Sequence, residues 1–473
     1  MSLAVLSVAS EAAPFVKTGG LADVAGALPK ALAAEGVEMR TLLPRYPALA
    51  PLGGEEVAAL DLPGGRARLL AAEAEGLSLL LLDAPHLYDR PGGPYVDGGG
   101  RDWGDNALRF GALAKAAALI GAGAVSGWRP SVVHAHDWQA GLAPTFLRAL
   151  GGPPAVLTIH NIAFQGRFGP HVIGPLGLPP ERFAREGYEF WGDVSFLKAG
   201  LIDAAKVTTV SPSYARELTE PGFGEGLDGV IRARLPDLSG VLNGIDEEAW
   251  NPETDLALPA RYSAAAPAGK AACKAALEAE FGLEPGPGPL FAVISRLTGQ
   301  KGFDLLLSAF PAALARGARL ALIGTGEPWL EQAFRDLASR NPGRVSARIA
   351  FDEALSHRMQ AGADALIVPS RFEPCGLTQL CALRYGTLPV VARTGGLADT
   401  VVDLNHAALA TGAGTGFQFT PGSAPALSAA LDRAMDLFAD RAAWRAAMRR
   451  AMKQPVGWGA SARAYAALYR SLA

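Results

Sequence analysis

Short apolar runs rich in β-branched residues recur along the chain, separated by Ala-, Leu- and Arg-rich stretches of helical length. Most of these runs do not alternate between apolar and polar residues, which is typical of strands buried on both faces of a parallel sheet. The predicted strands cover residues 3–8, 78–83, 131–135, 155–159, 206–210, 290–295, 319–323, 365–369 and 388–392. The clearest helical stretches cover residues 107–125 and 426–452. The pattern therefore predicts an α/β protein with doubly wound sheets.

The alternation of strands and helices is interrupted near residues 245–260, where prolines follow Asn251 and Leu258. A chain of 473 residues is too long for a single core. We therefore expect two Rossmann-like domains facing each other across a deep cleft, covering residues 1–250 and 251–455. The remaining residues, 456–473, are expected to form a helix that packs back on the first domain.

The amino-acid composition and net charge limit the kinds of binding partner that we expect. The formal net charge of −3 gives no reason to expect a nucleic-acid or membrane partner. No apolar run approaches the roughly 18 residues that a membrane-spanning helix needs, and no secretion signal is visible. The three cysteines, Cys273, Cys375 and Cys381, are few and odd in number, which suits a reducing compartment. We expect a cytoplasmic protein.

Nearly the same eight residues occur at both ends of the chain, as Lys17-Thr-Gly-Gly-Leu-Ala-Asp-Val24 and Arg393-Thr-Gly-Gly-Leu-Ala-Asp-Thr400. Each copy follows a predicted strand and combines a cation, a glycine pair and a helix start. Glycines let backbone amides approach a ligand, and a helix N-terminus favours anions. Either copy alone could be only a tight turn, but the duplication favours two halves that bind a substrate with an anionic tail.

Polar residues gather where the predicted strands end, which is where ligands bind in open α/β sheets. These segments are His136-Asp-Trp-Gln139, His160-Asn161, Asn243-Gly-Ile-Asp246, Ser295–Gly302 and Ser370–Thr378. They come from both halves of the chain. Together they indicate a functional cleft rather than unrelated surface loops.

The residues present also indicate the chemistry. Arg296 and Lys301 are spaced so that both head groups can reach one diphosphate, and Glu373 can accept hydrogen bonds from sugar hydroxyls. The amides that follow Glu373 suit sugar or phosphate oxygens. No Gly-x-x-x-x-Gly-Lys-[Ser/Thr] loop occurs, which argues against an ATPase, and no Asp-x-Asp pair occurs that would hold a metal–diphosphate. We therefore expect transfer from a nucleotide-linked donor without a metal or another cofactor.

Six motifs together resemble bacterial glycogen synthase, a family shared with plant starch synthases. They are Lys17–Val24, His134-Ala-His-Asp-Trp138, Thr158-Ile-His-Asn161, Asn243–Asp246, Ser295–Gly302 and Glu373-Pro-Cys-Gly-Leu-Thr378. The resemblance runs in order from the first strand to the last helix. It implies the GT-B fold and glucosyl transfer from ADP-glucose to the non-reducing end of an α-1,4-glucan such as glycogen, with retention of configuration and no metal. More distant retaining GT-B enzymes carry a second Glu eight residues after the first; Cys381 stands there in this chain.

The resemblance also implies roles for individual residues. The catalytic set would be Lys17, His160, Arg296, Lys301 and Glu373. His160 would contact the glucosyl unit near the anomeric centre, while Arg296 and Lys301 would stabilise the departing ADP. The donor would also contact Gly20, Cys375, Gly376, Leu377, Thr378 and Tyr385. The acceptor would be positioned by Tyr95, Asp137, Trp138 and Asn161. Three rings are either glucan-stacking surfaces or buried core: Trp103, Phe164 and Trp191.

The mechanism expected from the family is front-face transfer, in which the leaving phosphate helps deprotonate the acceptor hydroxyl. A double displacement would need a carboxylate nucleophile, and neither Asp137 nor Glu373 is clearly placed for that role. Two other functions fit the sequence. One is a retaining GT-B glycosyltransferase with a different nucleotide sugar or acceptor, and the other is a glucan-binding protein without turnover. A phosphorylase is a poorer fit, because those enzymes are much longer.

Overall fold

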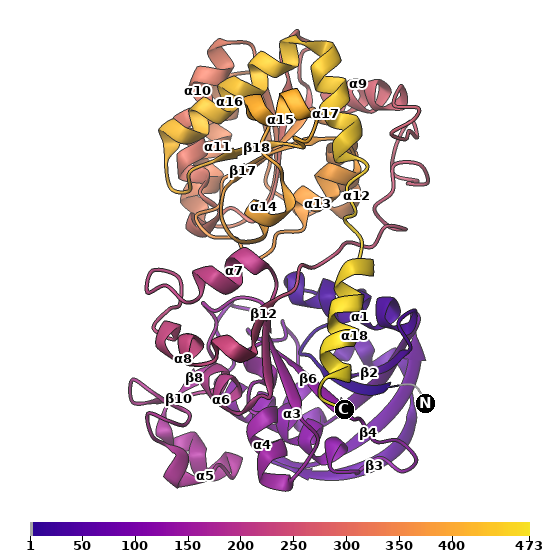
Figure 1. Ribbon diagram of the computed structural model, residues 1–473, viewed down its shortest axis with the longest axis vertical. Helices are drawn as coiled ribbons and strands as arrows, with labels where there is room; N and C mark the ends of the chain where they lie inside the picture. The colour runs from indigo at the N-terminus through magenta and orange to yellow at the C-terminus, as the bar shows by residue number, and fades with distance from the viewer. Residues whose placement is uncertain (1–2) are drawn as a thin grey trace. The chain divides into compact units, whose positions relative to one another are not determined.

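The computed structural model describes residues 3–473, which form two compact units (Figure 1). Unit 1 comprises the chain up to Asn243 together with Trp458–Ala473, and unit 2 comprises Gly244–Gly457. The polypeptide therefore leaves unit 1 after Asn243 and returns to it at Trp458. These breaks fall close to the positions expected from the sequence, residues 250 and 455, but at neither of them.

Unit 1 is built on a nine-stranded sheet. In spatial order its strands are β12 (Leu238–Gly240), β11 (Lys206–Thr209), β7 (Ala155–Ile159), β6 (Val132–His136), β1 (Leu3–Val8), β2 (Val37–Pro44), β5 (Leu77–Asp83), β4 (Gly65–Ala74) and β3 (Glu55–Leu62). Strands β12 to β5 are parallel, but β4 runs antiparallel to both β5 and β3. The parallel part of the sheet, which the unbroken apolar runs predict, therefore ends at β5. A separate antiparallel sheet contains β8 (Arg167–Phe168), β10 (Asp193–Ser195) and β9 (Glu189–Phe190).

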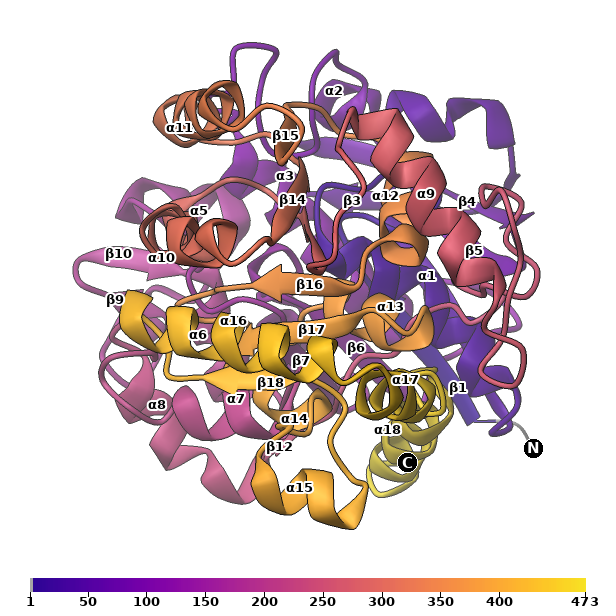
Figure 2. The ribbon, with the colours of Figure 1, turned by 90° about the horizontal axis from the view of Figure 1, so that it is seen from above.

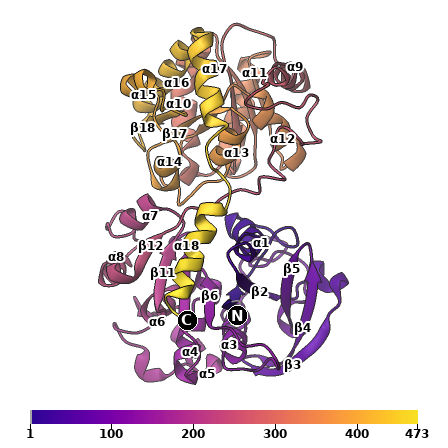
Figure 3. The ribbon, with the colours of Figure 1, turned by 45° about the vertical axis from the view of Figure 1, so that its right-hand side comes forward.

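The helix at the end of the chain completes the core of unit 1. Its longer helices are α1 (Gly20–Ala33), α3 (Asn106–Gly121), α4 (Ala143–Leu150), α6 (Phe196–Asp203) and α18 (Gly459–Arg470), and its short ones include α7 (Pro212–Glu217) and α8 (Asp228–Ala233). Figures 1 and 3 show α18 beside α1. Tyr465 and Tyr469 of α18 are fully buried in one cluster with Val24 and Leu28 of α1. This packing makes α18 part of unit 1.

Unit 2 is built on six parallel strands. In spatial order they are β15 (Val345–Arg348), β14 (Arg319–Ile323), β13 (Leu290–Ile294), β16 (Ala365–Val368), β17 (Leu388–Ala392) and β18 (Phe417–Phe419); Figure 2 shows β16, β17 and β18 following one another. Successive residues of β13 enter different apolar clusters, Phe291 and Val293 one and Leu290 and Ala292 the other. Both faces are therefore buried, which explains the unbroken apolar run in the sequence.

Helices cover both faces of this sheet. One cluster is completed by α10 (Phe303–Ala315), α11 (Pro328–Arg340) and α16 (Ala424–Ala439), and the other by α9 (Gly269–Phe281) and α12 (Glu353–Gly362). Figure 3 shows α9 and α12 on the side of the sheet opposite α10 and α16. The sheet and its helices form the doubly wound arrangement that the sequence predicts.

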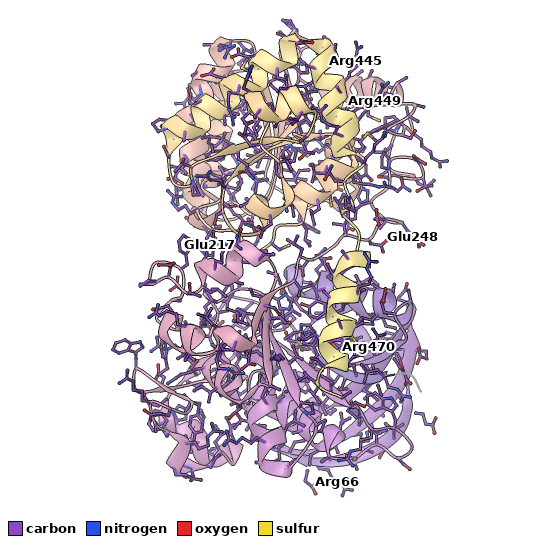
Figure 4. The ribbon with its side chains drawn as sticks, in the orientation of Figure 1. Arg66, Glu217, Glu248, Arg445, Arg449 and Arg470 are labelled. Atoms are coloured by element: carbon purple, nitrogen blue, oxygen red, sulfur yellow. The ribbon has the colours of Figure 1, made fainter. Side chains whose placement is uncertain are left out.

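The single helical stretch expected over residues 426–452 is two helices, α16 and α17 (Arg441–Ala451). Asp440 separates them, because its carboxylate accepts hydrogen bonds from the first amides of α17, Ala442 and Ala443. Trp444 of α17 is buried, while Arg445 and Arg449 extend from its exposed face (Figure 4). No helix within residues 3–473 is long and apolar enough to cross a membrane.

Candidate active site

In unit 2, the carboxyl ends of the neighbouring strands β13 and β16 bring Lys301 and Glu373 together. Lys301 Nζ donates to Glu373 Oε2 at 2.6 Å, and Ser370 Oγ donates to the same oxygen at 2.8 Å. Glu373 is buried and Lys301 is mostly buried. A cation and a carboxylate are therefore held in fixed positions at the edge of the sheet where ligands bind.

The two loops that carry this pair are joined by further contacts. Arg371 forms two hydrogen bonds with the Asp304 carboxylate, at 2.7 and 2.6 Å, and a third with the Gly299 carbonyl. At Gly302, where φ is +70°, an added Cβ would lie 2.1 Å from the Pro369 carbonyl oxygen. Only glycine allows this approach, so the backbone itself sets the distance between Lys301 and Glu373.

The other donor-side residues predicted from the sequence lie on the same two loops. Arg296 is exposed, and it belongs to none of the ion pairs in residues 3–473. Cys375 is buried, Gly376 has φ of +74°, and α13 (Thr378–Arg384) begins with no side chain capping its first turn. The structure thus brings a free guanidinium and uncapped backbone amides to the edge that holds the Lys301–Glu373 pair.

The two copies of the repeated octapeptide have different surroundings. An added Cβ at Gly19 would meet nothing within 4 Å, whereas one at the equivalent Gly395 would lie 2.0 Å from the Glu373 carbonyl oxygen. The Gly396 amide donates to the Glu373 and Pro374 carbonyls, both at 3.1 Å. The second glycine pair therefore supports the loop that carries Glu373. The expectation that both pairs offer open backbone for an anion is wrong for this copy.

Tyr385 does not occupy the place predicted for it. Its ring is fully buried at the C-terminal end of α13, and its hydroxyl donates to Asp255 Oδ2 at 2.5 Å. His357 Nδ1 lies 2.7 Å from the same carboxylate oxygen. Because the hydroxyl and the ring are both enclosed, Tyr385 anchors the segment that contains Asp255 and offers no surface to a nucleotide.

In unit 1, the loop between β1 and α1 carries Lys17, and Gly20 is the first residue of α1. The buried Glu11 carboxylate accepts hydrogen bonds from both the amide and the hydroxyl of Thr18, at 2.5 and 2.6 Å. Burial raises the pKa of Glu11, and the Thr18 hydrogen bonds oppose that rise. Lys17 is exposed and pairs with Asp23 at 2.7 Å, and Gly19, the residue before α1, has no side chain that could cap the helix. The loop therefore presents an exposed cation beside a helix N-terminus.

A buried histidine pair lies at the carboxyl ends of β6 and β7. His136 Nδ1 is 3.0 Å from His160 Nε2, and the Asp137 carboxylate accepts a hydrogen bond from the His160 amide at 2.6 Å. Burial lowers the pKa of His136 to about 3 and lowers that of His160 well below its usual value. Burial raises the pKa of Asp137 to about 7. Both histidines are therefore uncharged at neutral pH.

The residues predicted to hold the acceptor have varied surroundings. The Tyr95 hydroxyl lies 2.8 Å from Ser10 Oγ, next to the Glu11 loop. Asn161 Oδ1 accepts a hydrogen bond from the Ala163 amide at 3.0 Å. Trp138 is buried among Phe110, Phe168 and Phe196. Trp138 is thus part of a buried aromatic cluster.

Two of the three rings proposed as either glucan platforms or core are exposed. Phe164 is 56% exposed and Trp191 is 78% exposed. Trp103 is partly buried, donates from its indole to the Gly93 carbonyl and lies under the Arg90 guanidinium. Phe164 and Trp191 are therefore not core residues.

Two residues are absent from the sequence-based prediction, Glu11 and Phe351. Glu11 holds the loop before α1 in place, and it follows β1 closely, which is the signal that could have identified it. Phe351 is 82% exposed just beyond β15, at the carboxyl edge of the unit 2 sheet. Within residues 3–473, no three or more His, Cys, Asp or Glu side chains are arranged to hold a metal ion.

Comparisons with known proteins identify the class. Residues 4–233 match the family described as starch synthase catalytic domain, and residues 277–451 match glycosyl transferases group 1. The catalytic domain of starch synthase IV from Arabidopsis thaliana, solved bound to ADP and acarbose, is similar with a TM-score of 0.89 and 31% identity, covering 100% of this chain and 99% of that one. Two α/β units of this kind define a glycosyltransferase of the GT-B fold, as the sequence predicts.

Relatives in bacteria give the family. Glycogen synthases from Roseobacter denitrificans and Jannaschia sp. are 58% and 57% identical, each over 99% of this chain and 99% of the relative. The chain belongs to the glycogen synthase family, which confirms the resemblance seen in its motifs.

Proposed function

We propose that this protein transfers glucose from ADP-glucose to the non-reducing end of an α-1,4-glucan with retention of configuration. The observation that carries the proposal is the 58% identity to a glycogen synthase over 99% of both chains. The similar starch synthase IV, solved with ADP and acarbose, supports an adenine nucleotide and a glucan as ligands. Three free cysteines support a reducing compartment, and we place the reaction in the cytoplasm.

In this proposal, unit 2 binds the glucosyl donor, ADP-glucose. Arg296 and Lys301 bind the diphosphate and stabilise the charge that develops on the departing ADP, which makes a metal unnecessary in this proposal. Glu373, held by Lys301 and Ser370, accepts hydrogen bonds from glucose hydroxyls. The amides of Cys375, Gly376 and Leu377 and the Thr378 hydroxyl bind the remaining sugar and phosphate oxygens.

Phe351 is assigned to the nucleobase. An aromatic ring that is 82% exposed at the carboxyl edge of a nucleotide-binding sheet offers a flat face for stacking. This role replaces the one predicted for Tyr385, whose ring is enclosed.

In this proposal, unit 1 binds the glucan acceptor and contributes some contacts to the glucosyl donor. Lys17 and Gly20 contact the diphosphate and the sugar, since the loop presents an exposed cation beside a helix N-terminus. His160 contacts the glucosyl unit near the anomeric centre as an uncharged ring. Tyr95, Asp137 and Asn161 order the loops around the acceptor, and Phe164 and Trp191 offer exposed rings to a glucan. The leaving phosphate accepts the proton of the acceptor hydroxyl, in a front-face transfer.

Nucleotide release with glycogen as acceptor tests the proposal. With ADP-glucose, UDP-glucose and GDP-glucose in parallel, we expect ADP-glucose to give the highest kcat/KM. Lys301→Ala should lower kcat about 100-fold or more, on the scale of losing one transition-state donor. Release that is fastest with another sugar nucleotide would indicate a different retaining transferase. Glycogen binding without release from any donor would indicate a protein that only binds glucan.

A further inference from the structure

His136 contacts His160 directly, yet the reaction described above gives it no role. It is the last residue of β6, it is almost fully buried, and its Nδ1 lies 3.0 Å from His160 Nε2. Both rings are uncharged at neutral pH because burial disfavours the imidazolium. A neutral imidazole carries one N–H, so a single proton lies between the two rings, on one nitrogen or the other.

The other nitrogen of His136 decides between these two arrangements. His136 Nε2 is buried, and within residues 3–473 it has no hydrogen-bond partner. If His136 Nδ1 accepted from His160, the proton of His136 would be on Nε2 and would form a buried, unpaired N–H group. Orphaned buried N–H groups are rare in proteins. The arrangement that avoids one has His136 Nδ1–H donating to His160 Nε2.

A neighbouring histidine in the same strand has a different bonding pattern. His134 is also buried, but both of its nitrogens have partners, Thr158 Oγ1 at 2.6 Å and the Tyr469 hydroxyl at 2.7 Å. Its ring lies 4.1 Å from that of His136, centroid to centroid. His134 therefore connects strand β6 to α18 and β7 but has no hydrogen bond to His160.

We propose that His136 is a positioning residue that fixes the tautomer of His160, so that His160 presents Nδ1–H as a hydrogen-bond donor to an oxygen of the glucosyl donor. Because His160 Nε2 accepts from His136, the one proton of the neutral His160 ring is on Nδ1. His160 therefore cannot remove the proton of the acceptor hydroxyl through Nδ1. The inference rests on the proposed function only in naming the group that receives this hydrogen bond.

Long-range ¹H–¹⁵N correlation spectra of the full-length, unliganded protein labelled at its seven histidines test the tautomer directly. The His160 signals are assigned from their loss in His160→Gln. We expect a protonated Nδ1 and an unprotonated Nε2 on His160 at neutral pH. A His160 ring protonated at Nε2, or at both nitrogens, would overturn the proposal.

Two substitutions at one position separate hydrogen bonding from packing. His136→Asn keeps an N–H donor near the place of Nδ1, whereas His136→Leu has no polar atom. We expect His136→Leu to lose the fixed tautomer and to lower kcat about 100-fold with a smaller change in KM, and His136→Asn to recover most of that loss. His134→Leu, a buried histidine substitution in the same strand, controls for packing and should leave the His160 tautomer unchanged.

The spectra and the turnover measurements test different parts of the proposal, and each can contradict it independently of the other. A Nδ1–H tautomer in the wild type with full kcat in His136→Leu would refute the role of His136 in turnover. Absence of glucosyl transfer by the wild type would refute the proposed function, while the tautomer would still stand or fall by the spectra.

Discussion

At the scale of single residues, Asp137 shows how two opposing effects set a pKa. Its carboxylate accepts a hydrogen bond from the His160 amide, which favours the charged form, but its burial disfavours that form more strongly. The result is a pKa of about 7 in the folded protein, against an ordinary value of 3.8. Asp137 also has φ of +55°, a conformation that Asn tolerates well.

These properties predict how the stability of an Asp137→Asn variant depends on pH. The raised pKa means that the folded state binds more protons than the unfolded state between about pH 4 and pH 7, so Asp137 lowers stability progressively as pH rises through that window. Asn keeps the acceptor oxygen without the charge. We expect the variant to resemble the wild type near pH 4 and to be more stable at pH 8, by at most about 4 kcal/mol. Urea unfolding of both proteins at several pH values measures this, and parallel pH profiles would contradict it.

At the scale of elements, close backbone approaches hold in place the two loops that carry Lys301 and Glu373. Gly302 lies against the Pro369 carbonyl, and Gly396 lies against the Cys375 carbonyl. These contacts join segments that are far apart in sequence without using side chains. The position of Glu373 relative to Lys301 therefore depends on these two glycines as well as on the ion pair itself.

Gly302→Ala tests this dependence, with Gly412→Ala as a matched control. Both glycines have φ of +70°, but an added Cβ at Gly412 meets nothing within 4 Å, whereas one at Gly302 meets Pro369 O at 2.1 Å. The control should show only the cost of the left-handed conformation, about 1 kcal/mol, with normal turnover. Gly302→Ala should be destabilised by a further 1–3 kcal/mol or so from the clash and should lose at least about tenfold in kcat. Equal stabilities and turnover numbers for the two variants would show that the loop tolerates the clash.

The sequence predicts those elements whose burial is a local property. Strands such as β13 and β17 are recognisable because every residue is apolar, which reflects a sheet covered on both faces. Strands β3 and β4 were missed, since they are rich in Ala, Glu and Arg and become strands by pairing with each other and with β5. The same distinction between local and long-range features applies to the candidate site. The motifs identified Lys301 and Glu373, but the enclosure of Tyr385 depends on Asp255, a partner 130 residues away.

At the scale of the whole molecule, unit 1 includes the last residues of the chain. Tyr465 and Tyr469 are fully buried against residues of α1 and the central strands, and the Tyr469 hydroxyl lies 2.7 Å from His134 Nδ1. The C-terminal helix is therefore an internal element of unit 1 that supports the strand carrying His136.

Deletion of Trp458–Ala473 should unfold unit 1 and spare unit 2. It removes three large buried rings, each worth about 1.5–3 kcal/mol of burial, which together approach the whole stability of a typical domain. Calorimetry should show the transition of unit 1 lost or shifted well below that of unit 2. Arg463→Ala, on the exposed face of α18, is the control and should leave both transitions in place. A truncated chain with an intact first transition would contradict this account of α18.

The return of the chain to unit 1 also has a consequence for synthesis on the ribosome. Unit 1 begins to emerge first, but the 214 residues of Gly244–Gly457 must be translated before α18 exists. At typical rates of about 5–20 residues per second, this leaves an incomplete domain exposed for roughly 10–40 s. During that interval the apolar surface of α1 and the neighbouring strands has no cover from its own chain. We infer that the nascent protein depends on chaperones between the synthesis of these two segments, although both belong to unit 1 in the finished molecule.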